Sequence, residues 1–96
     1  MRYLALAGGL SGKKLDPFLV EYHHTESPRD FMAHETEEFF VLLSGEVNFY
    51  VYDNNTSRRL GPGETVYLKS QIPHRAELAE ACQKAEALII YSEPGE

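Results

Sequence analysis

Short runs of alternating or continuous apolar residues, separated by turn residues, follow one another along almost the whole chain. Helical periodicity is weak throughout, so this pattern restricts the fold to β structure. Strands are predicted at residues 17–24, 38–43, 46–53, 56–60, 64–68, 73–78 and 85–91. Six or more short strands at regular spacing are typical of a β-sandwich or a β-barrel. The chain has 96 residues, which is room for one such domain.

The connections between these strands carry turn residues. Asn54-Asn55 is predicted to form a two-residue hairpin turn, because asparagine tolerates positive φ. Gly61-Pro62-Gly63 predicts a second turn. The stretch 25–30, which contains Pro28, is predicted to be a loop. Residues 77–84 are rich in helix formers but stand between two predicted strands, so we expect a loop or a single helical turn there.

The beginning of the chain is less regular. Residues 3–10 end in Gly8-Gly9, and Gly12 follows shortly after. We expect residues 1–16 to form an N-terminal arm or an edge strand, which could pair with a partner subunit rather than with its own barrel. Residues 17–96 are then the barrel domain. No repeat, low-complexity segment or linker divides it further.

Charge and cysteine content exclude several functions. There are 9 basic and 15 acidic residues, which gives a net charge of −6. This charge argues against direct nucleic-acid binding by this segment and against binding to anionic membrane surfaces. No apolar run approaches the roughly 20 residues of a membrane-spanning helix. The single cysteine, Cys82, excludes an internal disulfide and is consistent with a reducing cytoplasm.

Three polar side chains have a spacing that suits a metal ion. His34 and Glu38 flank the start of a predicted strand, and His74 begins another strand after Pro73. Glu38 has the same parity as Phe40, so both are predicted to face the barrel interior. A carboxylate in an apolar interior is costly unless it is paired or bound to a cation. Two imidazoles and one carboxylate form the facial triad that binds Fe(II) or a similar divalent ion.

The sequence resembles the cupin superfamily in two motifs that stand in the right order. The first is His34-Glu35-Thr36-Glu37-Glu38 with Gly45 after it, and the second is Gly61-Pro62-Gly63-Glu64 with Pro73-His74 at its far end. The resemblance covers roughly residues 17–91. It implies an all-β fold, an antiparallel double-stranded β-helix or jelly-roll barrel with a ligand cavity, and often a homodimer. It also implies that His34, Glu38 and His74 occupy three of the family's four metal-ligand positions.

The fourth ligand position departs from the family pattern. The family usually has a histidine where this chain has Met32, and a thioether is a poor ligand for Fe(II), Mn(II) or Zn(II) beside a carboxylate. Either a three-ligand site completed by water remains, or the site has lost its metal. If a metal is present, Zn, Fe, Mn and Ni are the candidates.

Other side chains are candidates for binding a ligand. Phe40 is expected in the cavity wall. Tyr50 and Tyr52 would offer hydroxyl groups if their face of the strand is the interior; otherwise Phe49 packs inward, and the sequence leaves this parity open. His23-His24 is interpreted as a pair at the end of a strand without a role in the site.

The role that we expect first is a regulatory one. Residues 10–18 and 34–39 are similar to the C-terminal sensor domains of XRE-type helix-turn-helix transcriptional regulators, in which a cupin binds a small effector. That resemblance implies a small polar ligand and a DNA-binding domain elsewhere in a longer protein. The alternative is a metal-dependent enzyme, an Fe(II) dioxygenase or an isomerase, acting on a small polar substrate. A storage or structural cupin without a ligand is a weaker third possibility.

Overall fold

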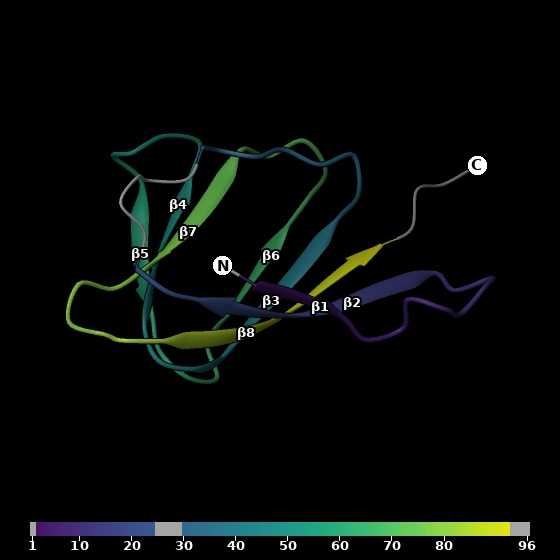
Figure 1. Ribbon diagram of the computed structural model, residues 1–96. Coiled ribbons are helices and arrows are strands. Elements are labelled where there is room, and N and C mark those ends of the chain that lie inside the picture. Colours follow the sequence, from purple (N-terminus) through teal and green to yellow (C-terminus); the bar gives the residue numbers. More distant parts are fainter. Residues whose placement is uncertain (1, 25–29, 93–96) are drawn as a thin grey trace.

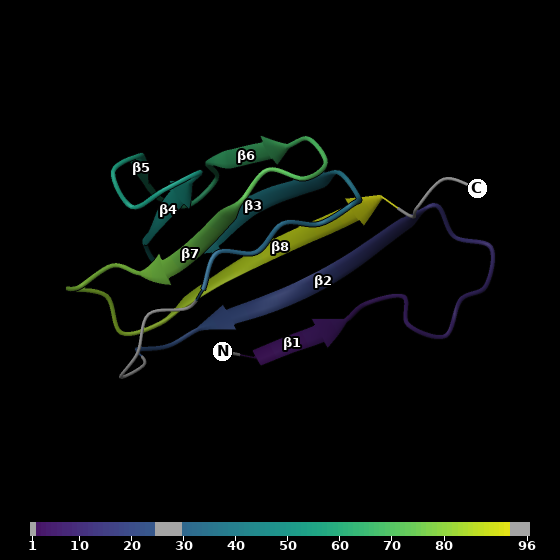
Figure 2. The same cartoon turned by 90° about the horizontal axis from the view of Figure 1, so that it is seen from above.

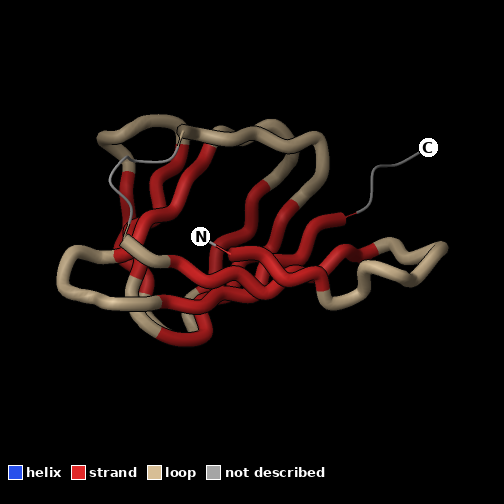
Figure 3. Tube along the Cα trace, in the orientation of Figure 1, coloured by secondary structure: helices blue, strands red, loops and turns tan. Residues whose placement is uncertain are grey.

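The computed structural model describes residues 2–24 and 30–92 (Figure 1). Its eight strands are β1 (Arg2–Ala5), β2 (Leu15–Tyr22), β3 (Glu38–Ser44), β4 (Val47–Val51), β5 (Ser57–Leu60), β6 (Thr65–Leu68), β7 (His74–Leu78) and β8 (Ala85–Ser92). The seven strands from β2 onward confirm the seven predicted strands, with ends that differ by two residues or fewer. Within the described ranges the chain contains strands and loops alone (Figure 3), so no helix there could cross a membrane.

The strands form two antiparallel sheets that face each other (Figure 2). The larger sheet has the order β1-β2-β8-β3-β6, and the smaller has the order β5-β4-β7. Neighbours in each sheet are mostly distant in the sequence, which is the arrangement of a jelly roll. The predicted all-β fold class is therefore confirmed.

The N-terminal segment adds a strand to the chain's own sheet. β1 pairs antiparallel with β2, with Tyr3 opposite Val20, and becomes the outer strand of the larger sheet. Pairing with a partner subunit, which the sequence left open, is thus replaced by pairing within the chain. β2 thereby has β1 along one edge and β8 along the other.

Alternation along the strands places the core between the two sheets. On β3, Glu38, Phe40 and Leu42 are buried while the residues between them are partly exposed. Buried side chains from both sheets build one cluster around Phe40, Leu42, Val47 and Leu60. The cluster fixes the inner face of each strand, because a shift by one residue would turn every side chain to the opposite face.

Turns were predicted in the β4–β5 connection and at residues 61–63, and the structure differs from the first prediction. The β4–β5 connection spans residues 52–56, so it is longer than the predicted two-residue turn at Asn54-Asn55. The left-handed residue is Tyr52, with φ of 70°, and not an asparagine. Asp53 stabilises the loop instead, since its side chain accepts a hydrogen bond from the backbone N–H of Asn55 at 2.8 Å. The predicted turn at 61–63 is present, with φ of 86° at Gly63.

Loops were also predicted at residues 77–84 and 25–30. Residues 79–84 form a loop without helix, as one of the two expectations for 77–84 stated, although β7 extends to Leu78. The predicted loop at 25–30 lies outside the described residues except for Asp30.

Candidate metal centre

Three chain segments bring His34, Glu38 and His74 to one place. Glu38 is the first residue of β3 and His74 the first residue of β7, and both lie on the inner faces of their sheets. His34 lies in the segment before β3. That segment is tied down because Gln71 donates its backbone N–H to the carbonyl of His34 at 2.7 Å. The predicted convergence of the three residues therefore occurs.

The ligand atoms of the three side chains lie within 4.8 Å of one another. The Nε2 atom of His74 is 3.3 Å from Oε1 of Glu38, and Nε2 of His34 is 3.9 Å from the same oxygen. Glu38 is 3% exposed, and His74 is nearly as buried. The two nitrogens and the carboxylate oxygen thus surround one small, water-poor volume.

One carboxylate oxygen of Glu38 has no hydrogen-bond partner in the described part of the chain. Its Oε1 atom is buried and makes no hydrogen bond with acceptable geometry, even though the His74 nitrogen is close. An unsatisfied buried carboxylate oxygen costs more than a neutral polar atom. A divalent cation among the three ligand atoms would satisfy it, so the residues present fit a metal ion.

The orientation of the His74 ring is set by the backbone. Its Nδ1 atom lies 2.9 Å from the carbonyl oxygen of Ile72. A carbonyl only accepts, so Nδ1 carries the proton and donates it, and Nε2 is the atom turned to Glu38. Metal-binding histidines usually have this second interaction, which fixes the tautomer and the ring.

The same surroundings alter the titration of His74. Burial lowers the pKa of His74, but the interaction with Glu38 and the backbone bond with Ile72 together outweigh burial, and the net pKa is raised. These surroundings therefore favour the cationic form of the His74 imidazole more than water does when no metal ion is bound. The site attracts positive charge, whether from a proton or from a metal ion.

Aromatic rings hold the two imidazoles in place. The His34 ring packs edge-on against Tyr91, with 5.2 Å between ring centroids. The Phe49 ring lies parallel to the His74 ring, at 6.0 Å, and meets Phe40 edge-on at 5.1 Å. These contacts pre-organise the site, because each ring fixes the rotamer of its neighbour.

The cavity in front of the three ligands is small. It has a volume of about 30 Å³, and Met32, Phe40 and Phe49 contribute to its wall. A water molecule needs roughly 10–15 Å³ of such space, so the cavity has room for an ion with one or two waters. In this conformation the cavity cannot enclose a larger effector.

The residues proposed for ligand binding are divided between two faces. Phe40 lies in the cavity wall. Tyr50 and Tyr52 lie outside it: the hydroxyl of Tyr50 donates to Glu77 at 3.0 Å, and Tyr52 is 62% exposed. Phe49 occupies the inward position, which settles the parity that the sequence left open.

The sequence did not identify Tyr91 as a residue of the site. Tyr91 stands directly opposite Glu38 in the β3–β8 pairing, so its side chain lies on the same face of the sheet. Nothing in a single sequence predicts that β3 and β8 are neighbours, because the paired residues Glu38 and Tyr91 are 53 positions apart and no local pattern links the two strands. The residue could be found only once the pairing was known.

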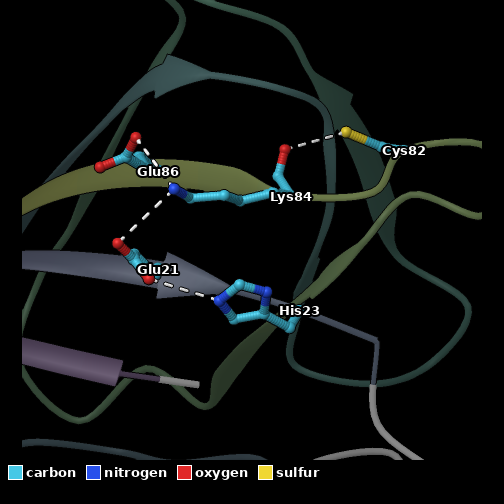
Figure 4. Close-up of polar contacts among 5 residues, drawn as sticks. All are labelled: Glu21, His23, Cys82, Lys84 and Glu86. Carbon is cyan, nitrogen blue, oxygen red and sulfur yellow. Dashed lines mark hydrogen bonds and ion pairs between the residues drawn. The ribbon is translucent and has the colours of Figure 1, made fainter.

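The remaining histidines and the cysteine are not among the three clustered ligands. Figure 4 shows His23 beside Glu21, and Cys82 beside Lys84. His23 is exposed and pairs with Glu21 at 3.3 Å, which lowers the pKa of Glu21. The Nε2 atom of His24 is 2.6 Å from the carbonyl of Cys82. The Cys82 thiol donates to the carbonyl of Lys84. These contacts agree with a structural role for the His23-His24 pair.

Comparison with known proteins supports this description of the fold. A family model described as "Cupin domain" matches residues 18–91. No protein with a curated description matches the sequence. Among solved structures, the chain is similar to the DMSP lyase DddQ from Ruegeria pomeroyi, with a TM-score of 0.80 and 26% identity over 99% of this chain and 48% of the other.

Two further structures are similar. A cupin 2 domain-containing protein from Halorhodospira halophila has a TM-score of 0.82 and 16% identity, over 99% of this chain and 65% of the other. Fe(II) HppE has a TM-score of 0.72 and 23% identity, over 81% of this chain and 42% of the other. The chain thus spans less than half the length of HppE and of the lyase.

Proposed function

The chain belongs to the cupin family, and on that basis we propose that it is a metal-dependent cupin with one divalent ion bound by His34, Glu38 and His74. The unsatisfied Oε1 atom of Glu38 carries this proposal. It is the single buried side-chain polar atom without a hydrogen bond in the described part of the chain, and it faces two imidazole nitrogens.

Each residue has a defined task in this proposal. Glu38 supplies the negative charge, and the backbone of Ile72 keeps the proton of His74 on Nδ1, so that Nε2 is free to bind. His34 is partly exposed and stands on the solvent side of the centre. A bound divalent ion supplies Lewis acidity and open positions for a small oxygen or nitrogen donor.

Two uses of such a centre follow from the family. Binding of a small polar effector would serve a regulatory role, as the sequence resemblance implies. Catalysis on a small substrate is supported by the similarity to Fe(II) HppE and to a DMSP lyase. The 30 Å³ cavity favours a ligand that reaches the metal with only a small polar group.

Metal content and metal-induced stability test the proposal together. The protein purified without chelator should contain about one equivalent of iron, nickel, manganese or zinc. A ligand at 100 times its Kd stabilises a fold by about 2.7 kcal/mol. For a domain of this size the metal should therefore raise Tm by roughly 10–20 °C.

The matched variants are Glu38→Gln and Glu37→Gln. Glu38→Gln should keep the fold, as shown by circular dichroism, but should lose the metal and the rise in Tm. Glu37→Gln is the control, because the Glu37 carboxylate accepts from the Tyr67 hydroxyl and is not among the three ligands. Equal metal binding by both variants would refute the proposed centre.

Oxygen uptake separates a dioxygenase from a regulatory cupin. An enzyme of the dioxygenase type should consume oxygen when the iron-loaded protein meets its substrate, and Glu38→Gln should not. A regulatory cupin should bind its effector without turnover. Titration of metal-loaded protein with small carboxylic acids and alcohols, followed by an oxygen electrode, distinguishes them.

A further inference from the structure

A second hollow lies on the other side of Phe49 from the metal centre. It has a volume of about 310 Å³, far larger than the first cavity, and Val51, Arg58 and Val66 help to line it. Phe49 is the one residue, among those described, that lines both spaces. The hollow opens between β5 and β6, the outermost strands of their respective sheets, which lie on the same side of the molecule (Figure 2).

The floor of this hollow is apolar. Phe49 is buried in the core, and Val51 and Val66 pack against the same core. Val66 stands opposite Phe40 in the β3–β6 pairing, so it shares the inner face of the sheet. Displacing water from an apolar floor is favourable for an apolar ligand.

Arg58 is the one cationic residue, in the part of the chain that is described, that lines this hollow. Arg58 lies directly opposite Phe49 in the β4–β5 pairing, so its side chain starts from the inner face of the sheet. Its side chain is 76% exposed and reaches outward over the hollow. Arg59, its neighbour, belongs to the opposite face, where it contacts Asn48 at 3.4 Å.

Arg58 is available to an anion. Among the described residues, its one ion pair is with Glu64, at 3.8 Å, and both side chains are exposed. Exposed pairs at this distance contribute little to stability, so a better-placed anion can replace Glu64. Glu64 has another role in any case, since its Oε1 atom accepts from the backbone N–H of Gly61 at 2.7 Å.

From this combination we infer that the hollow between β5 and β6 binds a small amphipathic monoanion, a carboxylate carrying a short aliphatic chain. The guanidinium of Arg58 binds the carboxylate through two parallel hydrogen bonds, and the chain lies on Phe49, Val51 and Val66. Thr56 and Thr65 also line the space. The net charge of −6 disfavours anions of higher charge.

This inference does not depend on the metal centre. An inward-facing charge on an edge strand also discourages pairing between molecules, and that role alone would require no ligand. The two roles differ in one measurable way, because only a binding site distinguishes hexanoate from a neutral molecule with the same chain.

Methyl-resolved NMR of the metal-free protein, titrated with hexanoate, tests the inference. We expect saturable shifts of the Val51 and Val66 methyl groups with a Kd of about 1 mM or tighter. Ile89, which lines the metal cavity, should not shift. Hexan-1-ol and acetate, which lack the charge and the chain respectively, should each bind at least tenfold more weakly.

Arg58→Gln and Arg59→Gln form a matched pair on one exposed strand. Arg58→Gln should weaken hexanoate binding by about tenfold to a hundredfold, because a hydrogen bond to a charged group is lost. Arg59→Gln should leave the affinity unchanged. Absence of saturable shifts, equal binding of hexan-1-ol, or equal effects of the two variants would each overturn the inference. Because the protein is metal-free, none of these outcomes bears on the metal centre.

Discussion

Glu38 is the residue on which the candidate centre depends. Its carboxylate is held in the core by β3, where an apolar side chain would fit the surroundings better, and one of its oxygens is unsatisfied. Proteins keep such a costly arrangement where binding compensates for it. The two imidazoles and the buried carboxylate are therefore best explained together, as one site for a cation.

Met32 offers a direct test at the scale of a single residue. Met32 and His74 form an antiparallel bridge, with each backbone N–H donating to the other's carbonyl at 2.9 Å. Directly opposed residues have side chains on the same face, so position 32 faces the centre. Met32→His should add a nitrogen ligand and tighten divalent-metal binding by about tenfold or more, which corresponds to about 1.4 kcal/mol.

Competition titration with a metal-binding dye measures this affinity. Met32→Leu is the control, since leucine has a similar volume and no donor atom, and its affinity should equal that of the unmodified protein. A Met32→His variant with unchanged affinity would mean that the side chain at position 32 does not reach the metal.

At this scale the sequence predicted the gathering of His34, Glu38 and His74 better than it predicted the rest of the cavity wall. The inward direction of Glu38 followed from its parity with Phe40, because alternation along one strand is a local property. Tyr50 and Tyr52 could not be placed in the same way. Whether they or Phe49 face inward depends on how β4 packs against the opposite sheet, which is a tertiary property.

At the scale of elements, turns position the strands that carry the centre. β3 has a register irregularity between Leu42 and Ser44, and Gly45 follows it with φ of 80°. A side chain at position 45 would collide with the backbone carbonyl of Lys84 and would come within 2.7 Å of the Ala85 Cβ atom. The turn between β3 and β4 therefore requires glycine.

Gly45→Ala should destabilise the fold by about 2–4 kcal/mol, since the left-handed conformation and the collision with Lys84 both add to the cost. Thermal unfolding should show a Tm lower by at least about 8 °C. Gly9→Ala is the control, because nothing lies within 4 Å of a Cβ atom there, and its Tm should be unchanged or slightly higher. If Gly45→Ala unfolds at the temperature of the unmodified protein, this account of the turn is wrong.

The positions of the strands along the chain were predictable, whereas the pairing of one strand with another was not. Seven strands followed from short apolar runs bounded by turn residues, and the 61–63 turn followed from its glycines and proline. The pairing of β1 with β2 and of β3 with β8 joins segments that carry no local sign of each other. The long β4–β5 loop was also missed, because the Asp53 side chain replaces the expected backbone turn.

On the scale of the whole molecule, the two sheets divide their shared interior into two unequal spaces. Phe49 separates a cavity of about 30 Å³ at the ligand cluster from a hollow of about 310 Å³ that opens at the strand edges. The smaller space suits an ion and the larger one an organic ligand. The two proposed ligands would thus be held by one short cupin chain without a second domain.

Anomalous diffraction from crystals of the metal-loaded protein, recorded at the absorption edge of the bound metal, tests the central claim most directly. We predict one anomalous peak per chain, within coordination distance of Nε2 of His34, Nε2 of His74 and Oε1 of Glu38. A peak elsewhere on the molecule, or no peak in crystals grown with an excess of iron, nickel, manganese or zinc, would contradict the account.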